Sequence, residues 1–388
     1  MAKWREVKMG DVCLIERGGS PRPIDKYITK EKNGINWIKI GDTNESMYIT
    51  STAQKIIPEG MKKSRYVQPG DFLLSNSMSF GRPYILAIDG CIHDGWLVLR
   101  DINNVFDKHF LYYYLSAPIT YQKFKSLAVG GVVNNLNSEM VRNIKVALPP
   151  MEEQQKIAAV LDKVSDLIAK RRQQLEKLDL LVKARFVEMF GKEDWKIDSL
   201  SSVAIITGGL TKNSNRNSFK LKLPYLRVAN VFFNKLDLNE VQYIGVKENE
   251  IEKTLLKKDD LLFVEGNGSK EQIGRVALWN GSIEPCLHQN HLIKARFKLK
   301  EINPLYALFY FMSDEGRKQI IGKSVSTSGL NTLSIKKIES LRIPIPEITL
   351  QNEFATFAKQ TEKTKTSVKE SLEKLETLKK ALMQEYFG

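Results

Sequence analysis

Leu148-Pro-Pro-Met-Glu-Glu-Gln154 decides the fold of this chain, because the stretch occurs again as Ile345-Pro-Glu-Ile-Thr-Leu-Gln351. The two copies are 351 − 154 = 197 positions apart. The same shift relates Met189-Phe-Gly191 to Tyr386-Phe-Gly388, since 388 − 191 = 197. The rear portion of the repeat therefore has a fixed length, and the chain consists of one layout written twice.

The front portions of the two copies match less regularly. Trp37-Ile-Lys-Ile-Gly-Asp42 corresponds to Tyr225-Leu-Arg-Val-Ala-Asn230 at a shift of 188, and Gly70-Asp-Phe-Leu-Leu74 corresponds to Asp259-Asp-Leu-Leu-Phe263 at 189. We expect two similar folded units with different surfaces. The predicted segments are a first domain over 1–150, a long helix over 151–191, a second domain over 192–346 and a long helix over 347–388.

Each rear portion has the pattern of a long amphipathic helix. Pro149-Pro150 and the acidic pair Glu152-Glu153 are typical of a helix start, and Phe190-Gly191 ends the first series as Phe387-Gly388 ends the second. Apolar residues then recur at steps of three and four, which indicates a coiled-coil seam. The predicted seam residues are Ile157, Leu161, Val164, Ile168, Leu175, Leu178, Val182, Met189, Phe354, Ala358, Val368, Leu372, Leu375, Leu382 and Tyr386. Its polar exceptions are Arg171, Arg185, Thr361, Lys365 and Lys379.

A single helix over 152–190 spans roughly 58 Å and cannot bury its own apolar stripe. We therefore expect the two helices to pair with each other. Antiparallel pairing places the two front units at opposite ends of a rod, whereas parallel pairing places both at one end. A helical hairpin that merely completes a core is the structural alternative. The predicted fold class is α+β: two mixed α/β domains joined by two long antiparallel coiled-coil helices with pseudo-two-fold symmetry.

Short apolar runs between turn residues predict strands in both front portions. We expect them at 12–15, 37–40, 72–74, 84–88 and 96–99, and again at 203–206, 225–228, 261–264, 275–278 and 291–295. An aromatic-rich helix follows in each copy, over 110–115 and 305–312. The intervening loops are rich in glycine, amide, hydroxyl and basic side chains, the types that contact phosphates and base edges, although ordinary surface turns share this composition. The candidate DNA contacts are Ser20, Arg22, Lys39, Asn44, Asn76, Ser77, Arg82, Asn134, Asn135, Lys212, Asn213, Arg216, Arg227, Asn230, Asn267, Ser269, Lys270, Ser326 and Asn331.

The net charge of +14 lies almost entirely in the two front portions. Residues 1–150 carry 20 − 14 = +6 and residues 192–346 carry 24 − 17 = +7, whereas the rear portions carry 8 − 7 = +1 and 7 − 7 = 0. A positive excess on a folded domain favours binding to a polyanion. The alternative is a generic basic surface with no such partner. Three scattered cysteines, no membrane-length apolar run and no apolar signal core at the start predict a cytoplasmic protein.

Signals for catalysis are weak. Gly316-Arg-Lys-Gln-Ile-Ile-Gly-Lys-Ser324 has one residue too many between its glycines for a phosphate-binding loop, and it would extend a helix instead of following a strand. Cys91-Ile-His93 and Cys286-Leu-His288 offer one Cys-x-His per unit and no second ligand pair at zinc-finger spacing, so buried strand positions explain them better. No catalytic, cofactor-binding or metal-binding residue is predicted.

The layout of the sequence resembles the specificity subunit of type I restriction-modification systems over essentially the whole chain. The resemblance is carried by Arg17-Gly-Gly-Ser-Pro21, Trp37–Asp42, Pro69-Gly-Asp-Phe-Leu-Leu-Ser75, Asn134-Asn-Leu-Asn137 and, above all, Leu148-Pro-Pro-Met-Glu-Glu-Gln-Gln-Lys-Ile-Ala158. The second copy departs from the pattern, because it lacks the adjacent proline pair and the Glu before Gln351. Its helix entry, or its contact with a partner, is expected to differ.

The resemblance implies two target recognition domains, each reading one half of a split, asymmetric DNA sequence, with the helices as a ruler between them. It implies no catalysis in this chain. Two modification subunits would bind S-adenosylmethionine and methylate adenine, and restriction subunits would use ATP and Mg²⁺. The competing function from another class is a coiled-coil scaffold for proteins, with basic lobes that read no DNA sequence. The sequence reveals neither the recognised bases nor the spacer length.

Overall fold

The computed structural model describes residues 4–76, 81–128, 135–191, 195–327 and 329–388. They group into two compact units, the first comprising Met1–Gln173 with Lys369–Gly388 and the second Gln174–Val368. The two long helices are α6 (Met151–Phe190) and α12 (Ile348–Phe387), and both are uninterrupted. Each unit therefore combines one front portion of the sequence with half of both helices.

The first unit contains two five-stranded sheets and a terminal strand pair. One sheet has the order β2 (Cys13–Arg17), β11 (Trp96–Asp101), β8 (Phe72–Ser75), β9 (Pro83–Leu86), β5 (Tyr48–Ile49). The other has the order β3 (Ile28–Thr29), β6 (Gln54–Ile56), β4 (Ile35–Ile38), β10 (Gly90–Ile92), β7 (Arg65–Val67), and β1 (Arg5–Lys8) pairs with β12 (Lys145–Leu148). The helices are α1 (Met9–Val12), α2 (Pro58–Met61), α3 (Lys108–Ser116), α4 (Pro118–Ala128) and α5 (Ser138–Arg142), with 3-10 turns η1 (Ile24–Lys26) and η2 (Ile40–Asp42).

The second unit repeats this framework with smaller sheets. Its main sheet has the order β14 (Ala204–Gly208), β23 (Leu292–Phe297), β19 (Leu261–Val264), β21 (Val276–Leu278), and β13 (Ile197–Ser199) pairs with β26 (Arg342–Pro344). Three smaller sheets complete the unit. One has the order β18 (Gln242–Gly245), β15 (Lys222–Leu226), β22 (Leu287–His288), and another pairs β16 (Val231–Phe232) with β17 (Lys235–Leu236). The third has the order β20 (Gly266–Asn267), β25 (Leu330–Thr332), β24 (Val325–Thr327). The helices are α7 (Leu200–Val203), α8 (Glu248–Thr254), α9 (Pro304–Met312), α10 (Asp314–Lys323) and α11 (Ile335–Glu339), with 3-10 turns η3 (Ser214–Ser218) and η4 (Val228–Asn230).

Several predicted strands have shifted ends. Val12 and Val203 end the short helices α1 and α7, and Ile40 and Val228 begin 3-10 turns. A turn of three or four residues is too short to show a helical period, so its apolar residues looked like part of the adjacent strand. The predicted aromatic helices are present as α3 and α9.

An ion pair explains why Gly70-Asp71 and Asp259-Asp260 recur. In both copies the first residue has a positive φ, which turns the chain into β8 or β19. The following carboxylate accepts a hydrogen bond from an arginine, 3.0 Å from Arg100 to Asp71 and 2.8 Å from Arg296 to Asp260. These motifs are therefore part of the framework of each domain.

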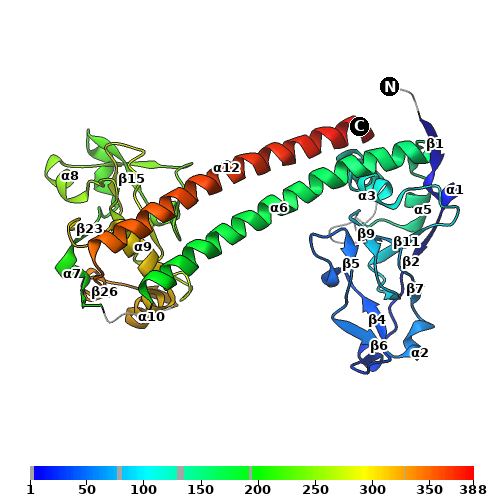
Figure 1. Ribbon diagram of the computed structural model, residues 1–388, viewed down its shortest axis with the longest axis horizontal. Coiled ribbons are helices and arrows are strands. Elements are labelled where there is room, and N and C mark those ends of the chain that lie inside the picture. The colour runs from blue at the N-terminus through cyan, green and yellow to red at the C-terminus, as the bar shows by residue number, and fades with distance from the viewer. Residues whose placement is uncertain (1–3, 77–80, 129–134, 192–194, 328) are drawn as a thin grey trace. The chain divides into compact units, whose positions relative to one another are not determined.

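The two long helices pack against each other with opposite chain directions (Figure 1). In the first unit, Leu161 near the start of α6 and Phe387 at the end of α12 share one core. In the second unit, Phe186 near the end of α6 shares a core with Phe354 near the start of α12. This confirms the predicted fold class of two mixed α/β domains with antiparallel long helices.

The predicted seam residues are all buried or partly buried. Polar seam positions have partners as well: Lys365 forms an ion pair with Asp179 at 2.7 Å, and the Lys379 ammonium lies over the Tyr113 ring. The aromatic residues that end each helix were not predicted as packing residues. Phe190 packs on Tyr306 of α9 with ring centroids 4.7 Å apart, and the equivalent Phe387 packs on α3.

The glutamine that closes the repeated motif fastens each long helix to its domain. Gln351 is fully buried; its Oε1 accepts a hydrogen bond from the Asn303 backbone, and its Nε2 donates to the carbonyls of Glu301 and Pro346. Gln154 makes the matching bonds to residues 105, 107 and 149. The motif thus fixes where the helix leaves the domain.

We expect Gln351→Ala to destabilise the second unit by about 2 kcal/mol, because it leaves buried backbone groups without their partner. Chemical denaturation followed by the signal of the tryptophans would measure this loss. Gln360→Ala on the exposed face of α12 is the matched control. An equal effect of both substitutions would contradict the role of Gln351.

Candidate nucleic-acid interface

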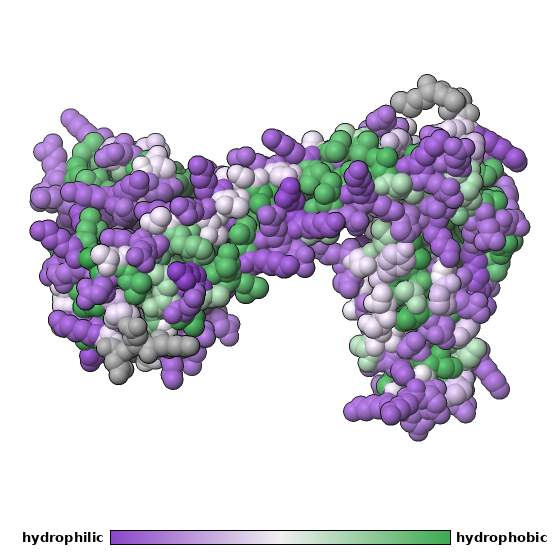
Figure 2. All heavy atoms as spheres, viewed as in Figure 1, coloured by the Kyte–Doolittle hydropathy of each residue, from purple (hydrophilic) through white to green (hydrophobic). Residues whose placement is uncertain are grey.

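The structure leaves many of the predicted DNA contacts on the surface, and the face shown in Figure 2 is largely hydrophilic over both units. The exposed candidates are Arg22, Asn44, Arg82, Asn135, Lys212, Asn213, Lys270 and Ser326. The partly buried candidates are Ser20, Lys39, Arg227, Asn267 and Ser269. Ser77 and Asn134 lie outside the described residues.

Asp94 brings two predicted loops of the first unit together. The Ser20 hydroxyl donates to its carboxylate at 2.9 Å, and the Arg22 guanidinium lies 3.5 Å from it. The Asn76 side chain donates to the Asp94 carbonyl at 2.9 Å, as does Arg17 at 3.1 Å. Burial raises the pKa of Asp94, but the Ser20 hydrogen bond and the nearby cations outweigh it and lower the pKa. Asp94 could not be predicted from the sequence, because a single acidic residue in a basic domain belongs to no motif.

Arg82 and Asn44 form a second exposed group in the first unit. The Arg82 guanidinium donates to the Asn44 carbonyl at 3.2 Å and lies over the Tyr84 ring. The other guanidinium nitrogens of Arg82 have no hydrogen bond among the described residues, and the side chain is exposed. An arginine held in this way can donate to a phosphate or to a guanine edge.

The second unit places three of its candidates on a small sheet, where the sequence predicted loops. Asn267 in β20 lies opposite Asn331 in β25, which lies opposite Ser326 in β24. Asn331 is buried and donates to the carbonyls of Asn267 and Gly268, so it shapes the turn that exposes Lys270. The strands have only two or three residues, too few for an alternating pattern in the sequence.

Other candidates serve the fold of their domain. Arg216 is buried and donates to Glu250 through two nitrogens, at 3.0 and 2.8 Å, which lowers the pKa of Glu250. Asn230 is buried, accepts a hydrogen bond from the Arg227 backbone and so caps η4. The Lys39 ammonium donates to Gln54.

The structure gives little support to the catalytic and metal-binding signals in the sequence. Cys91 and Cys286 are buried in the sheets, and burial raises the pKa of Cys91 to about 11 and that of Cys286 to about 12. Gly316–Lys323 belongs to α10, a helix of its own whose N-cap is Ser313 and whose C-cap is Ser324. Among the described residues there is no cluster of His, Cys, Asp and Glu that could hold a metal ion. Within the same residues no helix is long and apolar enough to cross a membrane.

The comparisons with known proteins agree on one family. The family model described as "Type I restriction modification DNA specificity domain" matches residues 1–178 and again 192–377. The chain is 24% identical over 370 residues to the EcoKI specificity subunit of Escherichia coli, covering 85% of this chain and 78% of that protein. It is 23% identical to the MjaVIII specificity subunit of Methanocaldococcus jannaschii, covering 98% and 91%. A third match, to the putative MjaX specificity subunit of the same archaeon, has 29% identity and covers 50% and 46%.

Solved structures show the same fold. A chain from a structural study of complex assembly and conformational transition in the type I R-M system matches with a TM-score of 0.65 at 17% identity, over 100% of this chain and 98% of the other. The S subunit from M. genitalium matches with a TM-score of 0.58 at 15% identity, over 99% and 96%. With the family model matched twice in a duplicated α/β framework, the chain belongs to the specificity subunits of type I restriction-modification systems.

Proposed function

We propose that the chain selects the DNA sequence for a type I restriction-modification complex by reading an asymmetric, two-part target. It is the non-catalytic component: two modification subunits supply S-adenosylmethionine and adenine methylation, and restriction subunits supply ATP-dependent cleavage. The complex would act in the cytoplasm, where the DNA and the reducing conditions for the three free, buried cysteines are found. Of the two functions left open by the sequence, family membership supports DNA recognition over a scaffold alone.

The observation that carries this proposal is one framework bearing two different surfaces. Both units share the order of their main sheet, β2–β11–β8–β9 in the first and β14–β23–β19–β21 in the second, together with the motif glutamines and the carboxylate–arginine pairs. Their candidate surfaces differ at equivalent places: Gly18-Gly19 is followed by Ser20, which donates to Asp94, whereas Gly208-Gly209 is followed by Leu210, which pairs with Gln289. Two different surfaces fit two different half-sites.

The contacts that we propose are the candidate side chains that are exposed or partly buried in the structure. They are Arg22, Asn44, Arg82, Asn135, Lys212, Asn213, Lys270 and Ser326, with Ser20, Lys39, Arg227, Asn267 and Ser269 at the edges. We propose no base contact for Asn76, Arg216, Asn230 or Asn331, because each is buried. Mapping methylated adenines in the host genome tests the proposal: a two-part motif supports it, and methylation lost on deletion of the modification subunit but unchanged on deletion of this chain would overturn it.

We expect Arg82→Ala and Lys270→Ala each to weaken binding of duplex DNA by the complex with the modification subunit. Removing one phosphate contact should lower the slope of log K against log salt by about 0.9. Lys318→Ala, which removes an exposed lysine of α10, is the control and should leave the slope unchanged. Equal slopes for all of these variants would argue against the proposed surface.

A further inference from the structure

Three side chains from separate segments of the first unit join strand β5, at the edge of the sheet β2–β11–β8–β9–β5, to α6. The Tyr48 hydroxyl of β5 lies 2.5 Å from Nε2 of His109 in α3. The Nδ1 of His109 lies 2.6 Å from the Asp162 carboxylate of α6, which also accepts a hydrogen bond from Tyr113 at 2.8 Å. The imidazole thus bridges a strand hydroxyl and a helix carboxylate.

The chain just before β5 makes a second connection. The Glu45 carboxylate forms an ion pair with Arg172 of α6 at 2.8 Å, and Arg172 also pairs with Glu376 of α12 at 2.9 Å. The neighbouring Asn44 accepts a hydrogen bond from Arg82, one of the proposed DNA contacts. Segment 44–48 therefore contacts Arg82 of the proposed DNA surface and Arg172 of α6, and Arg172 connects it to α12.

The second unit has different residues at the corresponding places. Because α3 begins at 108 and α9 at 304, a shift of 196 relates His109 to Leu305, and the motif shift of 197 relates Asp162 to Lys359. The shift of 188 in the front portion relates Tyr48 to Leu236. These counterparts cannot form the same bridge, since two of them are leucines.

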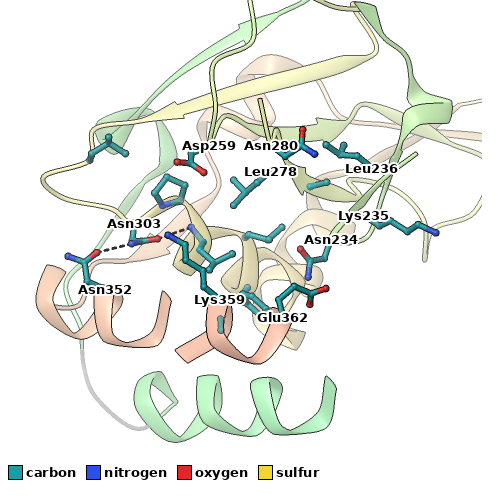
Figure 3. A pocket seen from close by; sticks show the side chains of 17 residues that line it. Asn234, Lys235, Leu236, Asp259, Leu278, Asn280, Asn303, Asn352, Lys359 and Glu362 are labelled. Carbon is teal, nitrogen blue, oxygen red and sulfur yellow. Dashed lines mark hydrogen bonds between the residues drawn. The ribbon is translucent and has the colours of Figure 1, made fainter. Parts of the chain in front are cut away.

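A groove of about 640 Å³ occupies this place in the second unit, and Leu236, Leu305 and Lys359 all line it. Figure 3 shows Lys359 and Glu362 of α12 on one side and Leu236 and Leu278 on the other. The same framework therefore folds with the groove open. The bridge in the first unit is not a requirement of the fold.

We propose that Tyr48, His109 and Asp162 are positioning residues that fix the first recognition domain on the helix pair, whereas the second domain lacks this fixed joint. The inference rests on the proposed function, because orientation matters only if both domains read one duplex. One base pair more or less rotates a half-site by about 35° around the DNA axis. A fixed joint therefore restricts the spacer length that the complex accepts.

The test uses the full chain with its modification subunit and duplexes that carry the mapped half-sites with the natural spacer, one base pair fewer or one more. For Asp162→Asn we expect the preference for the natural spacer to fall about tenfold, the equivalent of losing one hydrogen bond to a charged group. Tyr48→Phe removes one oxygen, keeps the ring in place and should show a smaller relaxation. Asp166→Asn, at an exposed position one turn along α6, should behave as wild type.

The possible outcomes are distinct. An unchanged spacer preference in both Asp162→Asn and Tyr48→Phe would overturn the proposal of a fixed joint. If Asp162→Asn fails to fold, the spacer preference of Tyr48→Phe alone tests the proposal. Methylation of duplexes with altered half-sites would also overturn it, because the residues would then serve base reading. A wild-type complex that ignores both half-sites would overturn the proposed function itself.

Discussion

Four residues added to each long helix should widen the unread gap in the DNA target by one or two base pairs and leave both half-sites unchanged. The insertions belong opposite each other, after Gln173 in α6 and after Leu372 in α12, beside the Arg172–Glu376 pair that sets the antiparallel register. Four helical residues span about 6 Å, and one base pair spans about 3.4 Å along the duplex. Sequencing of methylated adenines in a strain that carries the lengthened chain would measure the new gap.

Inserting the four residues into α6 alone is the informative control. It misaligns the seam of α6 against that of α12, so we expect weaker assembly instead of a clean change in spacing. A lengthened pair of helices that keeps the original gap, or that alters either half-site, would refute the ruler. The uninterrupted helices support the ruler, and the spacing measurement tests it.

The framework could be predicted because it depends on sequence patterns that are present in both copies of the repeat. A seam over some forty residues repeats the same period many times, and only a long paired helix buries it. The ends of α6 and α12 were placed within one residue by the proline entry and the final glycine. The packing role of Phe190 and Phe387 was not foreseen, because these residues meet helices that are remote in the sequence.

The candidate contacts were harder to predict, because loops use the same residue types to bind DNA and to satisfy their own backbone. Asn230 looked like a base-reading amide and caps a turn, while Arg216 looked like a phosphate contact and pairs with Glu250. Only tertiary burial separates the two roles. The bridge between Tyr48 and Asp162 was equally hidden, since its members are far apart in the chain.

The two copies of the Cys-x-His motif have different surroundings in the structure. In the second unit His288 is fully buried, its Nδ1 donates to the Thr254 carbonyl at 2.8 Å, and the Lys294 ammonium is buried nearby. Burial, helped by the positive charge of Lys294, lowers the pKa of His288 to about 4. In the first unit the corresponding His93 is partly exposed and lies 3.0 Å from Asp94.

Acid should therefore unfold the second unit through His288. The His288 side chain binds a proton near pH 6.5 in the unfolded chain but only near pH 4 in the folded domain. The free energy of unfolding is therefore unaffected by this histidine above pH 6.5 and falls as the pH drops from 6.5 to about 4. The loss approaches about 3 kcal/mol at the lower end. Denaturant titrations between pH 7 and pH 4 would measure it, and His288→Gln should flatten the profile even where it lowers stability at pH 7. The matched substitution His93→Gln should leave the acid slope of the second unit unchanged; a slope that persists in His288→Gln would assign the acid sensitivity to carboxylates instead.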